Sequence, residues 1–368
     1  MEREKLLKKW LLCIAPALLA GLMYFLLPFF PRFTEYVFTR KIFRILAFPI
    51  EFLVSLLPFS LTEVVVVAIP LAVITLLVFF VMRLIKSSKR SVVVEQCARF
   101  VAWFVSLFLL VFMFNDGAQF SRLSVAKLME LPNKQYTKEE LYIVTCDLAI
   151  KASKAGESIP RDSRGVAQLS MPLSQMLKKA DECYDNISLK YPFLKTGVTR
   201  VKPVKLSKWW SYTGTTGVYC PWLLEASVNI DIPASELGHT AAHEVAHTMG
   251  FARENECNFL SWLACMESGL PDYEYSGHLA AFIYCSNALY KADTELFVKA
   301  YSNCSSGVMA DLKYRNEYWN QFKGEVMESS QSFNDSFIKA NGDQSGILSY
   351  NKMTELVLRY YDKQGAFS

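Results

Sequence analysis

The chain has 368 residues, of which 52% are hydrophobic, and its formal net charge at pH 7 is only +4. So small a charge indicates no basic surface for nucleic acid, and we expect no nucleic-acid partner. The long apolar runs are concentrated before Asp116. We therefore divide the chain into a membrane anchor, residues 1–115, and a globular domain, residues 116–368.

Three apolar runs of the anchor are candidate transmembrane helices, at residues 10–30, 64–82 and 100–114. A helix rises 1.5 Å per residue, so about twenty apolar residues cross a hydrocarbon core of about 30 Å. Residues 32–59 interrupt their apolar stretches with prolines and a glutamate. That pattern favours an interfacial or re-entrant segment over a fourth span.

Basic residues predict the orientation in the membrane. They cluster at residues 1–9 and again at 83–90, and these two segments should face the cytoplasm. Three spans then place the domain outside the cytoplasm of a multi-pass protein of the cell membrane, with the lipid bilayer as a partner. A further basic cluster at residues 40–44 works against this orientation, and a fourth span within 32–59 would reverse it.

The domain has the mixed composition of a globular protein, with strand-like stretches at residues 198–210 and 213–232 between helical ones. We expect an α+β fold, mostly helical with a small sheet. Val228, Asn229 and Ile230 are candidates for an exposed sheet edge on which an extended peptide could pair. A plain core strand is the alternative.

The stretch AHEVAHTMGFARENECNFLSWLAC, residues 242–265, contains the motif H-E-x-x-H. On a helix, His243 and His247 share one face and can bind one zinc ion, while Glu244 lies beside them as the general base for an attacking water. The motif alone also occurs by coincidence on amphipathic helices. Gly250 is a candidate helix stop, and a second helix should follow it.

That second helix should supply the third zinc ligand. Glu254 and Asn258 are four residues apart and can both face the first helix. We predict Glu254 as the ligand and Asn258 as a partner that orients a histidine or the carboxylate. Glu256 is the reserve ligand. Arg253 occupies the place of a third histidine in a longer version of the motif, and arginine cannot bind zinc.

Hydrolysis also needs a donor for the oxyanion that develops on the scissile carbonyl. Tyr275, His278 and Tyr284 have suitable chemistry and lie downstream on a predicted helix at 275–290. A structural role is the alternative for each of them.

The chain resembles a bacterial family of membrane-anchored proteins known only as a domain of unknown function, whose members combine N-terminal spans with a metallopeptidase-like domain. The resemblance includes GVYCPWLLEASVN, SGHLAAFIYCSNALY, NDSFIKANGDQSGILSY and the H-E-x-x-H stretch. The last also resembles the gluzincins, whose later E-x-x-x-D or E-x-x-A-N supplies the third ligand. This resemblance implies a zincin-like domain with His243, His247 and Glu254 on zinc and Glu244 as base. The short separation of His247 and Glu254 departs from typical gluzincins.

Two hypotheses from different classes follow. The first is a membrane-anchored zinc metallopeptidase that hydrolyses peptide or protein substrates. The second is a non-catalytic scaffold or sensor of the cell envelope in which zinc only joins two helices. A closed structural zinc site has four protein ligands, whereas this stretch offers three strong ones.

Overall fold

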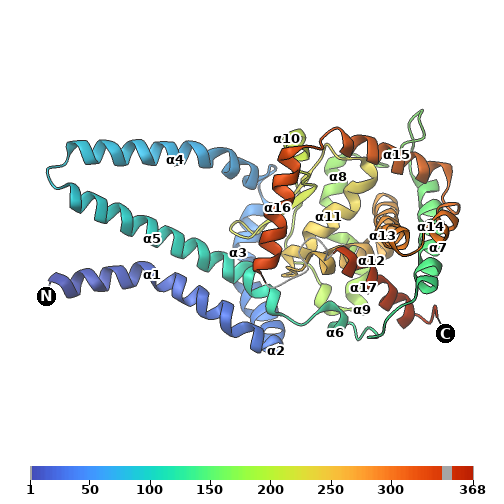
Figure 1. Cartoon of the computed structure of the whole chain (residues 1–368), viewed down its shortest axis with the longest axis horizontal. Helices are drawn as coiled ribbons and strands as arrows, with labels where there is room; N and C mark the ends of the chain where they lie inside the picture. The colour runs from blue at the N-terminus through green and yellow to red at the C-terminus, as the bar shows by residue number, and fades with distance from the viewer. Residues whose placement is uncertain (1, 342–349, 368) are drawn as a thin grey trace.

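The computed structural model describes residues 2–341 and 350–367, so the stretch NDSFIKANGDQSGILSY lies partly outside the described residues. The fold is mostly helical, with a small three-stranded sheet. Figure 1 shows long N-terminal helices that project to one side of a globular body, which contains the sheet and the later helices.

Three helices of the anchor are long and apolar enough to cross a membrane: Leu6–Phe29, Leu61–Lys86 and Arg90–Asn115. The three apolar runs predicted to span a membrane therefore lie in helices of sufficient length and apolarity. The third one begins ten residues before the predicted segment at 100–114. Arg99 can lie within it because its guanidinium pairs with Glu95 one helical turn earlier, at 2.9 Å. The anchor elements are α1 (Glu2–Leu26), η1 (Leu27–Phe29), α2 (Pro31–Phe33), η2 (Thr34–Phe43), α3 (Arg44–Ser55), α4 (Leu61–Lys86) and α5 (Arg90–Asn115).

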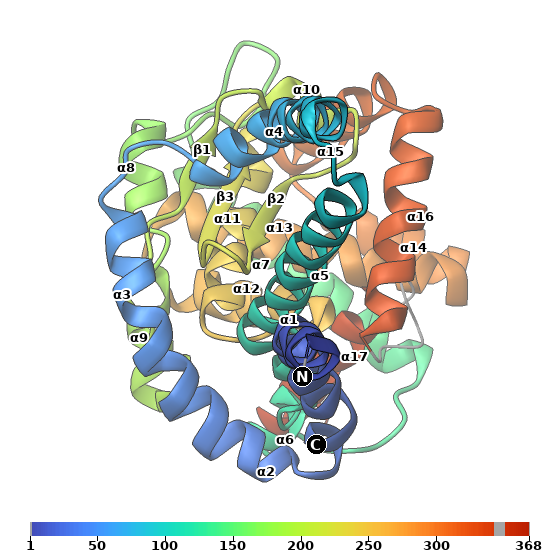
Figure 2. The ribbon, with the colours of Figure 1, turned by 90° about the vertical axis from the view of Figure 1, so that its left-hand side faces the viewer.

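The segment between α1 and α4 forms no candidate span and packs against the globular body. It consists of α2, the π-helix η2 and α3. Glu35 of η2 is completely buried and pairs with the buried Arg122 at 2.7 Å. Figure 2 looks along the spans and shows α3 side-on at one flank of the sheet. The predicted boundary at residue 116 therefore separates two parts that share a polar contact in their interior.

The sheet has the order β1-β3-β2, from β1 (Lys202–Val204), β2 (Gly217–Cys220) and β3 (Glu225–Asn229). β1 pairs with β3 in parallel, and β2 pairs with β3 antiparallel with Gly217 opposite Val228 and Cys220 opposite Glu225. The predicted strand at 198–210 is wrong in its second half, where α10 (Ser207–Ser211) is a short helix. The Ser207 hydroxyl explains part of this, because it donates to the Val204 carbonyl and starts the turn.

The centre of the body is a set of three mutually packed helices: α11 (Ala234–Thr248), α12 (Glu254–Glu267) and α13 (Pro271–Ala292). α11 also covers one face of the sheet, and α13 packs on α7 (Lys138–Ala155). The remaining helices surround this core: η3 (Gly117–Ser121), α6 (Val125–Leu128), η4 (Gly156–Ser158), α8 (Leu173–Lys178), η5 (Glu182–Tyr184), α9 (Asp185–Lys190), η6 (Pro192–Leu194), α14 (Thr294–Tyr301), α15 (Ser306–Asn320), α16 (Glu325–Ala340) and α17 (Tyr350–Lys363).

Candidate metal centre

α11 and the turn after it position the two histidines of the motif. The helix ends at Gly250, whose φ of +78° is a left-handed conformation that glycine adopts without strain. The Gly250 N–H donates to the His247 carbonyl at 2.9 Å, and the Phe251 N–H donates to the Ala246 carbonyl at 3.3 Å. These two bonds are a Schellman motif, so the helix stops as expected and the chain reverses into α12.

Three side chains from the two helices converge on one point. The Nε2 atoms of His243 and His247 are 3.1 Å apart, and Glu254 oxygens lie 3.2 Å from the first and 3.7 Å from the second. Ligand atoms about 2.1 Å from one tetrahedral ion are roughly 3.4 Å from each other. The spacing therefore fits a single zinc-sized cation. Their side chains are 12%, 10% and 26% exposed, respectively, so the cluster is enclosed but reachable through Glu254.

The other ring nitrogen of each histidine has an acceptor. His243 Nδ1 lies 3.0 Å from the Asn258 side-chain oxygen, and His247 Nδ1 lies 2.8 Å from the Phe251 carbonyl. An Nδ1–H that donates to an oxygen leaves the lone pair on Nε2, which is the atom that faces the cluster. Both rings are thus held in the tautomer that a cation needs. His239, one turn earlier, bonds to the Asn258 carbonyl and to Ser261 and joins the same two helices.

The two candidate glutamates have different environments. Glu254 lies in the cluster of three, whereas Glu256 accepts hydrogen bonds from the Val125 N–H and from Arg253 and points away. Burial alone would raise the pKa of Glu254, but hydrogen bonding from His243 and the charges of both histidines outweigh burial and lower the pKa to about 2. Of the two carboxylates, only Glu254 is placed to bind the cation.

Glu244 is buried, with 4% of its surface exposed, and lies between α11 and the sheet. Its Oε2 has no hydrogen-bond partner among the described residues. Burial raises the pKa of this carboxyl to about 8. Gly217 of β2 packs directly on it, since a Cβ at position 217 would come within 2.4 Å of Glu244 Oε1. An unpartnered buried carboxylate oxygen next to two histidines is an acceptor for a water molecule.

β2 is the edge strand of the sheet near this cluster, whereas the predicted edge residues lie elsewhere in the sheet or after it. Val228 and Asn229 belong to β3, which is paired on both sides, and Ile230 follows that strand. The prediction of an edge at 228–230 is therefore wrong, because a second strand, β2, forms from the glycine-containing stretch before the turn. Tyr219 of β2 stacks on the His247 ring, with centroids 5.9 Å apart and planes at 13°.

The anchor side of the molecule completes the surroundings of the cluster. Arg122 donates to the Gly250 carbonyl at 2.6 Å while it pairs with Glu35. A Cβ at Gly250 would contact Thr39 and Gln119 at 3.0 to 3.1 Å. Asp116, the first residue after α5, is buried, and burial together with the nearby charge of Glu254 raises its pKa to about 7. Residues from η2 and η3, together with Arg122, thus hold the turn that places Glu254.

The three predicted oxyanion donors lie on α13. The Tyr275 hydroxyl donates to Asp311 of α15, and its ring lies under Arg161. His278 is buried, and burial and the charge of Lys151 on α7 lower its pKa to about 4. Tyr284 packs half-buried against the main hydrophobic core. Tyr275 is bonded to α15, and the charges that act on His278 belong to α7 rather than to the cluster, which favours the structural alternative for both.

A model of the family described as Protein of unknown function (DUF3810) matches residues 38–358. The chain belongs to this family. No curated protein and no solved structure matches it. Membership confirms the predicted family of unknown function and carries no activity with it. The matched range of this DUF3810 protein begins within η2 and includes α3, α4, α5 and the whole cluster.

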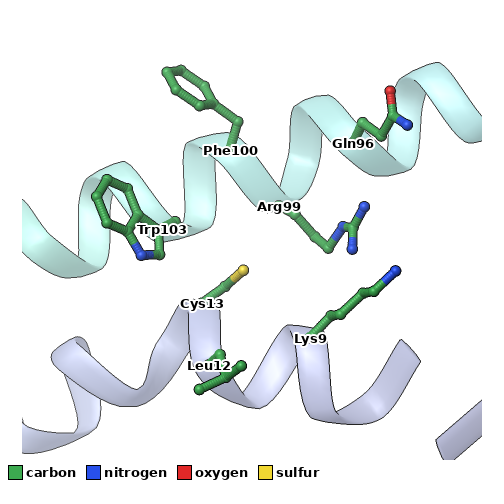
Figure 3. A pocket seen from close by; sticks show the side chains of 7 residues that line it. All are labelled: Lys9, Leu12, Cys13, Gln96, Arg99, Phe100 and Trp103. Carbon is green, nitrogen blue, oxygen red and sulfur yellow. The ribbon is translucent and has the colours of Figure 1, made fainter. Parts of the chain in front are cut away.

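A separate groove of about 480 Å³ in the DUF3810 protein lies between α1 and α5 (Figure 3). Its lining residues come from these two helices alone: Lys9, Leu12, Cys13, Gln96, Arg99, Phe100 and Trp103. It is a shallow apolar surface between two spans and contains none of the cluster residues.

Sequence reasoning missed four residues around the cluster: Gly217, Tyr219, Asp116 and Arg122. Gly217 and Tyr219 belong to GVYCPW, a conspicuous stretch whose distance to the motif only the sheet register reveals. Asp116 and Arg122 had no local signal, because a charged residue after an apolar helix is ordinary at a membrane boundary. Their role depends on contacts across more than a hundred residues of sequence.

Proposed function

We propose that this DUF3810 protein is a membrane-anchored, zinc-dependent metallopeptidase. The observation that carries the proposal is the convergence of His243, His247 and Glu254, whose ligand atoms lie within 4.8 Å of one another, beside the unpartnered carboxylate oxygen of Glu244. A zinc ion held by these three residues would lower the pKa of a water molecule and polarise a peptide carbonyl.

Each residue of the chain has a separate task in this mechanism. Asn258 and the Phe251 carbonyl fix the ring orientation and the tautomer of the two histidines. Glu244 accepts the proton of the attacking water and delivers it to the leaving amine. Enclosure of the carboxylate matters for this role, because its Oε2 has no hydrogen-bond partner among the described residues and can take the proton of a water molecule and return it.

The open edge of β2 offers a binding surface for an extended peptide. Among the described residues, β2 is paired only with β3, so its outer backbone groups have no sheet partner there. A peptide that adds to this edge as a further strand would pass the Glu244 carboxylate, because Gly217 lies directly on it. The absence of a side chain at Gly217 lets the strand approach the base.

The alternative function is a non-catalytic scaffold or sensor in which zinc only joins two helices. A structural zinc ion is usually enclosed by four protein ligands. Glu256 would be the fourth ligand here, but its carboxylate is engaged with the Val125 N–H and with Arg253. A set of three histidine and carboxylate ligands with one neighbouring base favours an open, catalytic site.

We further propose that the globular body lies outside the cytoplasm. The N-terminus and the α4–α5 turn lie at the same end, far from the body (Figure 1), and basic residues gather there: Lys8, Lys9, Arg83, Lys86, Lys89 and Arg90. The opposing cluster near the body is engaged internally, since Arg40 pairs with Glu35 at 2.8 Å and Arg44 donates to the Lys195 carbonyl at 3.0 Å.

The test uses the full chain in vesicles, because η2 of the anchor packs on the turn of the cluster. Wild type, Glu244→Gln and His243→Ala would be compared for bound zinc and for cleavage of a mixed peptide library. We expect zinc in the first two proteins and cleavage only in the wild type, with a loss in Glu244→Gln of about 10²- to 10⁴-fold. Glu256→Gln is the matched control, and it should keep both zinc and cleavage.

Zinc in wild type and Glu244→Gln without cleavage by either would favour the scaffold. Equal cleavage by wild type and Glu244→Gln would remove Glu244 from the mechanism. Absence of zinc from the wild-type protein would overturn the proposal as a whole.

A further inference from the structure

The sheet beside the cluster is fastened to the ends of two membrane-spanning helices. The Glu225 carboxylate of β3 accepts the Leu61 and Thr62 N–H groups at the start of α4, at 3.0 and 2.8 Å. Asn115, the last residue of α5, donates to the Pro221 carbonyl at 2.6 Å. Buried bonds to charged and amide groups hold a fixed geometry. The height of the sheet above the bilayer is therefore set by the spans themselves.

The turn that follows β2 reaches into the membrane-spanning part. Trp222 stacks on Phe108 of α5 with centroids 4.2 Å apart, and its indole N–H donates to the Phe108 carbonyl at 3.1 Å. Phe108 precedes the end of α5 by seven residues, which is about 10 Å along a helix. Tryptophan is also a typical residue of the interface between lipid and water. Trp222 thus marks the level of the bilayer surface.

Two amphipathic helices lie at this level on either side of the sheet. Figure 2 shows α3 and α16 side-on at opposite flanks, while α4 is seen end-on, so both run across the direction of the spans. α3 exposes Ile45 and Leu53, and α16 exposes Val326 and Phe333, all at 58% or more. Helices with one apolar face exposed in this orientation are typical of the membrane surface.

β2 connects the bilayer surface with the cluster. Gly217 contacts Glu244, and Trp222 lies at the surface five residues later. β2 is extended from Gly217 to Cys220, which is about 10 Å at 3.3 Å per residue, and Trp222 lies in the turn that follows. A polypeptide paired with the β2 edge would leave the bilayer near Trp222 and meet Glu244 within about five residues.

We infer that the substrate is an integral membrane protein, cleaved in the extended segment that emerges from the bilayer, about five residues from its span. This inference rests on the proposed peptidase function. It specifies the substrate class, because the edge strand, its anchoring turn and the two flanking helices together bring the site to the membrane surface.

The experiment measures where the cut falls. The full-length protein is reconstituted in vesicles with a test substrate, in which one apolar helix is followed by a long, unstructured repeat of a single cleavable peptide unit. The same repeat as a free peptide, and the same repeat fused to a soluble domain, are the matched controls. Mass spectrometry locates the cleaved bonds, and Glu244→Gln controls for contaminating proteases.

We expect cuts in the tethered repeat to cluster about five residues from the span, with cleavage at least about tenfold faster than for either soluble control. Cuts spread evenly along the tethered repeat, at the rate of the free peptide, would overturn the inference and leave the peptidase proposal intact. Absence of Glu244-dependent cleavage from all three substrates, with zinc bound, would instead contradict the peptidase proposal on which the inference rests.

Discussion

α4 and α11 show opposite relations between composition and burial. The most apolar stretch of α4 contains no buried residue, and of the whole helix only Thr62 and Glu63, next to the sheet, are buried. In α11 twelve of the fifteen residues are buried, and Glu244 and His247 are among them. One helix thus presents apolar side chains outward, while the other encloses ionisable groups.

Each of the two helices requires something different from its environment. The backbone groups of α4 form their hydrogen bonds within the helix. α4 therefore needs only surroundings as apolar as its side chains, and lipid supplies them. α11 needs specific partners for each polar group, and α12, β2 and the turn at Gly250 provide them. Changes to α4 should therefore be tolerated wherever apolarity is kept, and changes to α11 and its neighbours should not.

The strongest effect that we expect is a loss of zinc affinity when one of two buried histidines is removed. His247→Ala should lower zinc affinity by more than about a hundredfold, because loss of an outer partner alone costs about 10- to 100-fold. His278→Ala, on α13, should leave zinc affinity unchanged, since His278 lies beside α7. Zinc titration of both full-length variants checks the difference. Equal loss of zinc in the two variants would mean that general unfolding, and not ligand removal, is measured.

The second prediction compares leucines in the two environments. Leu260 of α12 is completely buried in the core, whereas Leu77 of α4 is 57% exposed. Leu260→Ala should cost about 2–5 kcal/mol of unfolding free energy through lost contacts and a cavity. Leu77→Ala opens no cavity and should cost less than about 1 kcal/mol, because lipid fills the space. Denaturant unfolding in the same lipid or detergent measures both. A similar cost for the two would show that α4 is packed against protein.

The third prediction compares two glycines. Gly217→Ala places a methyl group 2.4 Å from Glu244 Oε1, so the carboxylate or the strand must move. Cleavage should fall at least about tenfold with zinc retained, because small displacements of a base are costly. Gly21→Ala in α1 meets nothing within 4 Å and should leave cleavage unchanged. Activity of Gly217→Ala equal to that of the wild type would separate β2 from the catalytic step.

The local sequence was sufficient to predict those parts of the site that depend on residues close to one another in the chain. A four-residue spacing places His243 and His247 on one helical face, Gly250 stops that helix, and the next helix brings Glu254 and Asn258 back towards it. The three spans followed from length and apolarity in the same way. These features depend on neighbours within about one or two helical turns.

The remaining features depend on contacts that join distant segments. β2 is the edge strand because β3 pairs with both β2 and β1. In the sequence, the glycine-containing stretch of β2 looked like part of one longer strand. The contact of Arg122 with Glu35 joins the anchor to the turn at Gly250 across 87 residues. Composition predicted an independent domain after residue 116 because it cannot reveal such a contact.

The weakest effect that we predict is the pH dependence of stability that arises from the pair of Glu35 and Arg122. Burial alone would raise the pKa of Glu35, but hydrogen bonds and charge from Arg122 and Arg40 outweigh it and lower the pKa below its ordinary value of 4.5. A carboxylate with a lowered folded-state pKa stabilises the fold fully above the unfolded value and loses that contribution as the pH falls through the folded one. Stability should thus decline below about pH 4.5, with a slope of at most about 1.4 kcal/mol per pH unit from this one group.

Glu35→Gln tests this assignment, because glutamine cannot titrate. Its stability should be lower than that of the wild type at neutral pH, since Arg122 stays buried without its counter-charge. The gap between the two proteins should narrow as the pH falls, and Lys339→Ala, which removes an exposed pair with Asp335, should show no such change. Unfolding midpoints of the three full-length proteins across this pH range measure the gap. A gap that stays constant would mean that Glu35 is uncharged in the fold, and that Arg122 holds the turn at Gly250 without the charge of the anchor.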